Sequence, residues 1–467
     1  MQFTSIPFFI FLFAVVIAYY VLPYRFRNYL LLLASYYFYF SIQAEYLVLL
    51  IASTAFNYCL GLLLEKYREK KGLLLSAGLI FNLGLLFFFK YFNFFGDQIN
   101  ALFSAVSLNL TIPHHSLILP IGISFYTFMA FGYVLDVYWG DIKAQKNLLT
   151  FSVYLAFFPQ ILSGPIGRAK NLFQQFTNEH PFLYENFSNG FRLMLWGLFK
   201  KMVVADSIGA YVDAVFNNIP MHSSLTLIVA AMFYPLQLYA DFGGYTDIAR
   251  GVGKLFGFDL MVNFRTPYVN STSVTDYWKR NHISLTTWLK DYIFYPFMGM
   301  NTSKAKIYLG ISLMFLVSGI WHGVGWMFII WGLLQALLLI IEDATGWGSF
   351  KKGNLFVVWG RKIFTYMVVA ASLVFFRLPD IHSLKEYIRS ISSASWRLFT
   401  GSNTTILHIL IAVVTLVIVE IFMDKKQADQ WIASKSLMFR WSSYLIISLI
   451  IALIGAIDGA SFIYFQF

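Results

Sequence analysis

Long apolar runs separated by short polar connectors dominate this chain of 467 residues. In its first third the runs cover 5–23, 28–43, 45–65, 73–92 and 117–139. A helix needs about 20 largely apolar residues to cross the hydrocarbon core of a bilayer, and these runs approach that length. Because 5–23 has no basic front region and no small-residue cleavage site, we interpret it as a first membrane helix and not as a removed signal.

The rest of the chain continues this pattern with more interruptions. The later runs are 148–163, 187–206, 223–240, 307–320, 326–341, 355–376, 404–423 and 443–465. The first of them contains Pro159 and is followed by Pro165, and proline breaks a helix interior. We therefore predict an all-α, polytopic transmembrane helical bundle with about eleven spans.

The composition is typical of a membrane protein. Only 12% of the residues are charged and 58% are hydrophobic, whereas a soluble domain carries about 25% charged residues. Cys59 is the only cysteine, so the chain has no disulfide framework. We see no separate soluble domain and predict a single transmembrane domain over 1–467, with its most motif-rich part at 119–342.

The formal net charge of +11 is informative about topology. Lys and Arg are divided among short connectors and form no coherent basic face, which argues against a nucleic-acid partner. Cytoplasmic connectors attract these residues under the positive-inside rule. The rule predicts that 66–71 and 250–306 are cytoplasmic and that 93–116 is external.

The stretch 250–306 is the least hydrophobic part of the chain. Its eight Lys and Arg outnumber its three Asp, and it contains apolar pieces too short to span, such as 292–298. Non-helical backbone at membrane depth is tolerated only where protein or a wet cavity surrounds it. We therefore expect re-entrant cytoplasmic segments here. The sequence shows no internal repeat, which argues against an inverted-repeat transporter.

One ionisable side chain, His322, stands between the apolar runs 307–320 and 326–341. Such residues at membrane depth usually face the bundle interior or a water-filled cavity and mark a functional site. Imidazole takes up and releases a proton near neutral pH, which suits a general base. The neighbouring Gly319, Gly323 and Gly325 would let a substrate approach the ring. The alternative is a structural histidine bonded to a backbone carbonyl.

A second histidine, His282, follows charged and aromatic residues. Lys279 and Arg280 beside Trp278 supply cationic donors and an aromatic face, a combination that suits a phosphorylated, ring-bearing ligand. Ser284 adds a hydroxyl donor. The same composition is typical of a basic, aromatic belt at the membrane interface, and both interpretations stay open.

Three acidic residues, Asp241, Asp247 and Asp291, border apolar sequence. Each could orient a histidine by accepting its second ring proton, or pair with a nearby Lys or Arg for structure. We expect structural pairing for two of the three. The sequence has no metal-ligand spacing, no nucleotide-binding glycine loop and no serine-nucleophile elbow, and we predict no metal site.

These motifs together resemble the membrane-bound O-acyltransferase family, and within it the bacterial branch of alginate O-acetyltransferases and teichoic acid D-alanyl transferases. The matching stretches are Leu119–Phe128, Phe157–Ile166, Tyr239–Asp247, Asp276–Leu285, Trp288–Tyr292, Gly319–Gly323 and Phe462–Phe467. The chain departs from the family pattern at Lys279-Arg280-Asn281, where members often have two arginines or a tryptophan.

The resemblance implies a helical bundle around a central tunnel, with an acyl donor entering from the cytoplasm and the acceptor from outside. His322 falls on the family's catalytic histidine and His282 on its second histidine. We expect His322 to deprotonate the acceptor hydroxyl and His282 to hold the donor or stabilise the oxyanion. The residues expected to bind substrate are Trp278, Lys279, Arg280, Ser284, Asp291, Trp321 and Asp241.

The expected reaction is transfer of acetyl from acetyl-CoA, a co-substrate and not a resident cofactor, to a hydroxyl of an extracytoplasmic polysaccharide. Transfer is direct or passes through a relay protein, and an extracytoplasmic SGNH-type protein is the expected partner besides membrane lipids. The expected location is the inner membrane of a bacterium. Two alternatives stay open: transfer of D-alanine or another acyl group from a carrier protein, and a polysaccharide or lipid transporter without chemistry.

Overall fold

The structure is a computed structural model that describes residues 1–116, 118–300, 302–349, 353–393, 395–401, 403–423, 426–456 and 462–463, without the side chains of 403–405. Over these ranges every regular element is a helix, which confirms the predicted all-α class. Residues 457–461 and 464–465 of the predicted run 443–465 lie outside the described residues. Of the C-terminal stretch that resembles the family, only Phe462 and Ile463 are described.

The contacts within the chain define two compact units, of which the first comprises Met1–Phe182 and Phe256–Phe258. Its α-helices are α1 (Ile6–Val21), α2 (Tyr24–Phe40), α3 (Leu47–Lys66), α4 (Lys71–Leu86), α5 (Phe92–Ala105), α6 (Ile123–Trp139), α7 (Leu148–Ala156) and α8 (Ala169–Thr177). Short 3-10 or π segments are η1 (Ala44–Tyr46), η2 (Arg68–Lys70) and η3 (Phe87–Tyr91). α6 packs against α3 and α4 and buries most of its side chains. The helix break predicted within 148–163 is confirmed, because α7 ends at Ala156.

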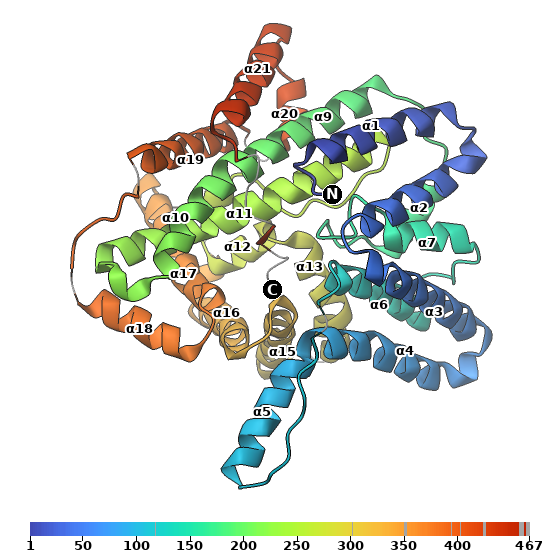
Figure 1. The fold of residues 1–467 in the computed structure, drawn as a ribbon, viewed down its shortest axis with the longest axis horizontal. Helices are drawn as coiled ribbons and strands as arrows, with labels where there is room; N and C mark the ends of the chain where they lie inside the picture. The colour runs from blue at the N-terminus through green and yellow to red at the C-terminus, as the bar shows by residue number, and fades with distance from the viewer. Residues whose placement is uncertain are drawn as a thin grey trace. The chain divides into compact units, whose positions relative to one another are not determined.

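A helical arm, Arg68–Ala105, belongs to this first unit. It runs through η2, α4, η3 and α5, and it is 38 residues long. The segment that returns from it is tied to α5 by amide side chains: Asn100 donates to the Ile112 carbonyl (3.0 Å) and accepts from the Ile112 N–H (2.7 Å). Asn93 pairs in the same way with the backbone of His115, at 2.9 Å in both directions. Figure 1 shows α5 and its return segment in blue, extending away from α4.

The second unit comprises Leu183–Leu255 and Asp259–Phe467. Its α-helices, drawn from green to red in Figure 1, are α9 (Tyr184–Leu198), α10 (Asp206–Phe216), α11 (Ser224–Leu255), α12 (Val274–Arg280), α13 (Ile283–Leu289), α14 (Tyr295–Met298), α15 (Lys304–His322), α16 (Trp326–Thr345), α17 (Leu355–Arg377), α18 (Ile381–Ser392), α19 (Asn403–Met423), α20 (Ala428–Ala433) and α21 (Leu437–Ile454). Short segments are η4 (Phe199–Ala205), η5 (Ile219–Met221), η6 (Tyr268–Asn270), η7 (Lys290–Phe294) and η8 (Trp347–Ser349).

The long helix α11 organises the second unit by packing closely against α9. A Cβ atom at Gly197 of α9 would lie 2.6 Å from the carbonyl oxygen of Gly244 on α11, so neither position has room for a side chain. Small residues at such a crossing let helix backbones approach closely, which is how membrane helices gain van der Waals contact. The close crossing at Gly244 holds the neighbouring turns of α11, including Tyr239 and Phe242, in a fixed position.

Eight helical stretches among the described residues are long and apolar enough to span a membrane, which confirms a polytopic architecture. They are Ala44–Lys66, Arg68–Ala105, Ser224–Leu255, Lys304–His322, Trp326–Thr345, Leu355–Arg377, Ile406–Met423 and Leu437–Ile454. The predicted count of about eleven is not confirmed. α1, α2 and α6 have 16 or 17 residues, which at about 1.5 Å per residue is short of the roughly 30 Å of hydrocarbon.

Within the stretch 250–306, the residues between the end of α11 (Leu255) and the start of α15 (Lys304) form only short helices. α12 and α13 have seven residues each and α14 has four, so none of them can cross a bilayer. Side chains such as Tyr277 and Trp288 are nevertheless buried. Short helices enclosed by protein agree with the expected re-entrant character, and their cytoplasmic side stays a prediction.

Candidate active site

His282 lies at the junction between α12 and α13, where the backbone is unusually constrained. α12 begins with the Ser273 hydroxyl accepting the Asp276 N–H at 3.0 Å, a capping bond that fixes the helix start. His282 has φ +45°, in the left-handed region that a non-glycine residue seldom occupies. Asn263 holds the following turn, because its backbone carbonyl accepts from Ile283 (3.0 Å) and its side-chain oxygen from Ser284 (3.1 Å). Strained backbone of this kind is often found at functional sites.

His322 is the last residue of α15, where the chain turns into α16. The two helices pack through glycine: a Cβ at Gly319 would lie 2.4 Å from the carbonyl oxygen of Phe328, and one at Gly323 would lie 2.2 Å from the Phe328 ring. The space beside Gly319 and Gly323 is thus occupied by Phe328 of α16, whereas a Cβ at Gly325 would meet no atom within 4 Å. Access of a substrate to the imidazole past these glycines stays a prediction.

The two histidines face each other across one small cavity. Their ring centroids are 6.1 Å apart with an interplanar angle of 65°, and the side chains are only 2% (His282) and 4% (His322) exposed. The cavity has a volume of about 40 Å³. Its lining residues are Leu238, Tyr239, Phe242, Phe264, Tyr268, Tyr277, Trp278, Asn281, His282, His322, Trp331, Leu373 and Phe376.

Aromatic rings fix the orientation of both imidazoles. His322 lies against Trp331 (5.1 Å between centroids) and Phe376 (5.3 Å). His282 lies edge to face with Phe242 at 4.6 Å, and Trp321 is 6.0 Å from it. Packed rings of this size leave little rotational freedom, so the histidines are held in place for chemistry in a site with little water.

The environment of His282 keeps it neutral. Burial lowers the pKa of its imidazole from 6.5 to about 3, because the charged form would lose its hydration. A neutral imidazole has one nitrogen that donates and one that accepts a hydrogen bond. His282 can therefore donate a hydrogen bond to a developing oxyanion without itself carrying charge.

The structure brings some of the predicted substrate-binding residues to the histidines. Trp278 lines the cavity, and its indole N–H donates to the Gln335 side-chain oxygen at 3.2 Å. The ring centroid of Trp321 is 4.9 Å from that of His322. These two residues are therefore part of the histidine site, as their neighbourhood in the sequence suggested.

Lys279 and Arg280 lie on a different cavity. This second cavity, of about 690 Å³, is lined by Met261, Val262, Arg265, Thr266, Asp276, Lys279, Arg280, Ile283 and Gln427. Arg280 is held by an ion pair with Asp276 (3.0 Å), whereas Lys279 is exposed. The two cavities share no lining residue, and α12 contributes to both.

The remaining predicted residues lie away from the histidine cavity. Asp241 pairs with Lys201 at 2.7 Å and accepts the Ile463 N–H at 2.7 Å. Asp247 pairs with Lys200 at 2.6 Å. Asp291 is exposed on η7, and Ser284 is fully buried without lining the cavity. Ion pairing is thus what the structure shows for Asp241 and Asp247, which agrees with the expectation for two of the three acids.

Several residues of the site were not predicted from the sequence. The polar ones are Tyr239, Tyr268, Tyr277 and Asn281, where the Asn281 amide donates to the Tyr277 hydroxyl at 2.8 Å. Glu420 supports them from α19: it accepts the Tyr268 backbone N–H at 2.9 Å and the hydroxyl of Tyr239. Tyr277 and Asn281 lie within the matching stretch Asp276–Leu285, and Tyr239 begins the stretch Tyr239–Asp247, so these three could have been found from the sequence. Glu420, Leu373 and Phe376 carry no local signal.

Comparison with known proteins identifies the class of enzyme to which this fold and site belong. The sequence model of the membrane-bound O-acyltransferase family matches residues 141–349, which include both histidines. A probable alginate O-acetylase of Pseudomonas putida is 37% identical over 81% of this chain and 78% of its own length. The chain therefore belongs to the membrane-bound O-acyltransferase family, and it is a multi-pass membrane O-acyltransferase.

Two further relatives place the chain within that family. The peptidoglycan O-acetyltransferase of Helicobacter pylori is 32% identical over 82% of this chain and 79% of its own length. The teichoic acid D-alanyltransferase of Bacillus subtilis is 30% identical over 53% of this chain and 63% of its own length. The similarity is thus more extensive to the acetyl-transferring relatives than to the D-alanyl-transferring one.

Proposed function

We propose that this protein transfers acetyl from acetyl-CoA, bound from the cytoplasm, to a hydroxyl of an extracytoplasmic polysaccharide, with His322 as general base. The observation that carries the proposal is the pair of enclosed imidazoles, 6.1 Å apart across one cavity. The similarity to an alginate O-acetylase and a peptidoglycan O-acetyltransferase supports acetyl as the acyl group and a polysaccharide as the acceptor.

In the proposed reaction His322 removes the proton of the acceptor hydroxyl while the oxygen attacks the thioester carbonyl carbon. The carbon–oxygen bond forms, and the tetrahedral intermediate carries its negative charge on the former carbonyl oxygen. His282, neutral at physiological pH because burial lowers its pKa to about 3, donates a hydrogen bond to that oxygen. The carbon–sulfur bond then breaks, and the proton held by His322 passes to the CoA thiolate. The products are the O-acetyl ester and CoA.

The size of the histidine cavity limits what it can hold. Its volume of about 40 Å³ is small beside the roughly 300–1,000 Å³ of a typical ligand pocket. A cavity of this size suits a small group such as acetyl better than a sugar ring or the pantetheine arm of CoA. Those parts of the substrates must therefore lie outside it or widen it when they bind.

The second cavity is the proposed site of the donor's phosphates. Lys279, Arg280 and Arg265 line it, and guanidinium and ammonium groups bind phosphate oxygens well. Trp278, next to Lys279, lines the histidine cavity instead. A donor held by its phosphates at one face of α12 would therefore have its thioester directed toward the other face.

Acetyl transfer to the polysaccharide is direct or passes through a hydroxyl on a relay protein. For the relayed route we propose an extracytoplasmic SGNH-type partner, and the proposed location is the inner membrane of a bacterium. The three relatives named above are transferases or acetylases, which favours an enzyme over the transporter considered from the sequence.

The test uses the purified full chain in liposomes with radiolabelled acetyl-CoA and an O-deacetylated polysaccharide. We expect label in the polymer and an equal amount of free CoA thiol, both lost in His322→Ala. If the protein instead transfers D-alanine from a charged carrier protein and leaves acetyl-CoA intact, the acetyl assignment fails. If CoA is released and labelled polymer forms only when an SGNH-type protein is added, the relayed route is established.

A further inference from the structure

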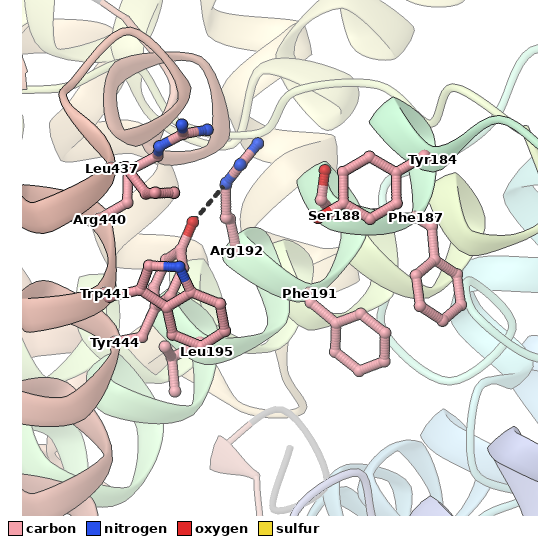
Figure 2. Close-up of a pocket in the computed structure, with 10 residues that line it drawn as sticks. All are labelled: Tyr184, Phe187, Ser188, Phe191, Arg192, Leu195, Leu437, Arg440, Trp441 and Tyr444. Carbon is pink, nitrogen blue, oxygen red and sulfur yellow. Dashed lines mark hydrogen bonds between the residues drawn. The ribbon is translucent and has the colours of Figure 1, made fainter.

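A third cavity lies between α9 and α21, and it shares no residue with the histidine cavity or with the cavity at Lys279. Its volume is about 380 Å³. It is lined by Tyr184, Phe187, Ser188, Phe191, Arg192, Leu195, Leu437, Arg440, Trp441 and Tyr444 (Figure 2). We refer to it as the α9–α21 cleft. Acyl transfer as proposed above makes no use of it.

Two arginines with unbalanced charge stand in this otherwise apolar cleft. Arg192 is only 8% exposed. Its Nε donates to the Tyr444 hydroxyl at 2.8 Å and its Nη1 to the Asn189 side-chain oxygen at 2.5 Å. Both partners are neutral, so they satisfy hydrogen bonds without cancelling the charge. An enclosed charge without a counter-ion is unfavourable, which indicates that an anion belongs beside it.

Arg440 adds a second positive charge from α21. Its Nε is enclosed and has no hydrogen-bond partner among the described residues. Neither arginine forms an ion pair within the described part of the chain. In Figure 2 the guanidinium groups of Arg192 and Arg440 lie toward the same end of the cleft, with the aromatic rings below them and to the side. Arginine binds phosphate through two parallel hydrogen bonds, so this pair suits a phosphate group.

The position of the cleft along its helices matches the depth of lipid headgroups. Tyr184, Phe187 and Ser188 belong to the first two turns of α9, and Arg440 and Trp441 to the first two turns of α21. α21 is long and apolar enough to span a membrane and has no buried side chain. Tyrosine and tryptophan at the ends of membrane helices mark the interface between headgroups and hydrocarbon.

We propose that the α9–α21 cleft binds an anionic membrane phospholipid. Arg192 and Arg440 hold the phosphate, and an acyl chain packs along Phe187, Phe191 and Trp441. Basic pockets between membrane helices recognise anionic headgroups in this way. A zwitterionic lipid fits less well, because its ammonium group would lie near two arginines. The site is independent of the acyl transfer proposed above, so either proposal can fail while the other stands.

The experiment measures lipid retention by native mass spectrometry of the full chain in detergent. We expect one phosphatidylglycerol molecule to stay bound, about tenfold more tightly than phosphatidylcholine. Replacing both arginines (Arg192→Gln with Arg440→Gln) should remove that preference. The matched control is Lys435→Gln, which removes the same charge from an exposed residue of the neighbouring connector outside the cleft and should leave the preference intact.

Three results would overturn the proposal. The first is equal phosphatidylglycerol retention by the double variant and by wild type. The second is displacement of the lipid by millimolar inorganic phosphate, which would make the cleft a site for a free anion. The third is displacement by CoA that the double variant abolishes, which would make it part of the donor site. If Arg192→Gln does not fold, Arg440→Gln should still weaken retention and Arg192→Lys should preserve most of it, because lysine keeps the charge.

Discussion

The histidine cavity and the ion pairs around α11 are two polar regions buried in the same unit. In the ion pairs the charged groups contact one another, whereas in the cavity the polar groups surround an open space. In the ion-pair cluster Lys200 meets Asp247 at 2.6 Å, and Lys201 meets both Asp206 (2.8 Å) and Asp241 (2.7 Å). In the cavity two imidazoles, of which that of His282 is neutral, and several phenol groups surround a space of about 40 Å³. None of these five lysine and aspartate residues lines that space.

The difference teaches how to distinguish structural from functional polar groups in a membrane interior. Buried ions that are paired with each other have no capacity left for a substrate, and removing one partner leaves an uncompensated charge. Neutral donors and acceptors around a space have capacity for a reacting group and cost less to bury. We therefore expect substitutions in the cluster to lower stability and substitutions at the cavity to lower turnover.

The largest expected effect is on turnover in His322→Ala. Loss of the general base should lower acetyl transfer by roughly 10²–10⁴-fold. The variant should elute from a size-exclusion column like the wild type, which shows that it is folded. His382→Ala is the matched control, because His382 is 79% exposed and should retain wild-type activity. Near-normal turnover of His322→Ala at saturating donor would contradict the assignment of the base.

The second prediction concerns the ion-pair cluster. Lys201→Met should destabilise the protein by about 3–5 kcal/mol, because it leaves Asp206 and Asp241 enclosed without their cation. Thermal unfolding in detergent measures this, and activity per folded molecule should be unchanged. Asp241→Asn should cost less, since Lys201 keeps Asp206. Lys385→Met, on an exposed lysine, is the control. A stable but inactive Lys201→Met would contradict the claim that the ion-pair cluster serves stability and not turnover.

The third prediction separates His282 from its charged neighbours. His282→Ala should lower kcat by roughly 10²–10³-fold, because a donor to the oxyanion acts only in the transition state. The donor KM should change little. Gln in place of His282 retains an N–H donor and should recover part of the lost rate. If His282→Ala raises only the donor KM, the residue binds the donor and does not stabilise the oxyanion.

Replacing both Lys279 and Arg280 with Gln should affect the donor KM more than kcat, the opposite of what we expect for His282→Ala. The donor KM should rise about threefold to tenfold, because two exposed or half-exposed charges contribute little each, and kcat should fall less. The dependence of donor KM on salt concentration should weaken in the variant. An unchanged KM for acetyl-CoA would remove the second cavity from the donor site.

The smallest expected effect is on the pH dependence of stability. The pKa of His282 is about 3 when folded and 6.5 as its reference value. Below pH 6.5 the unfolded chain takes up a proton that the folded chain does not, so stability falls as the pH is lowered. The loss is about 1.4 kcal/mol for each pH unit between these limits. The unfolding temperature should therefore fall less between pH 7 and 5.5 in His282→Asn than in wild type, and an identical fall in both would contradict the enclosed, neutral state of His282.

Both histidines of the cavity could be selected from the sequence, because an ionisable residue within or beside apolar sequence is conspicuous; their catalytic roles stay a prediction. It could not decide the roles of the acids. Asp241 pairs with Lys201, which lies 40 residues earlier in the sequence, on the π-helical segment that follows α9. Nothing in the local pattern around either residue indicates that contact, because it arises only from the close packing of α9 against α11.

The division of the chain into helices was predicted better than the number of crossings. The apolar runs at 326–341 and 355–376 coincide with α16 and α17. The run at 187–206 instead continues through α9 into the π-helical segment η4, where Lys200 and Lys201 are enclosed by ion pairs. Hydropathy counts apolar residues but does not detect whether a helix keeps its 3.6-residue period. It also gives no sign of the aspartates that pair with Lys200 and Lys201, because these lie elsewhere in the sequence.

The helical arm Arg68–Ala105 is longer than a single membrane crossing requires. At about 1.5 Å per residue its 38 residues extend roughly 57 Å, nearly twice the roughly 30 Å thickness of the hydrocarbon core. Headgroups add only about 5–8 Å on each side. The arm is not straight, however: Figure 1 shows α5 leaving α4 at an angle beyond η3. α4 with η3 (Lys71–Tyr91) is by itself long enough for one crossing. α5 and its return segment, with the exposed Asp97–His114 pair, are therefore length in excess of a single crossing.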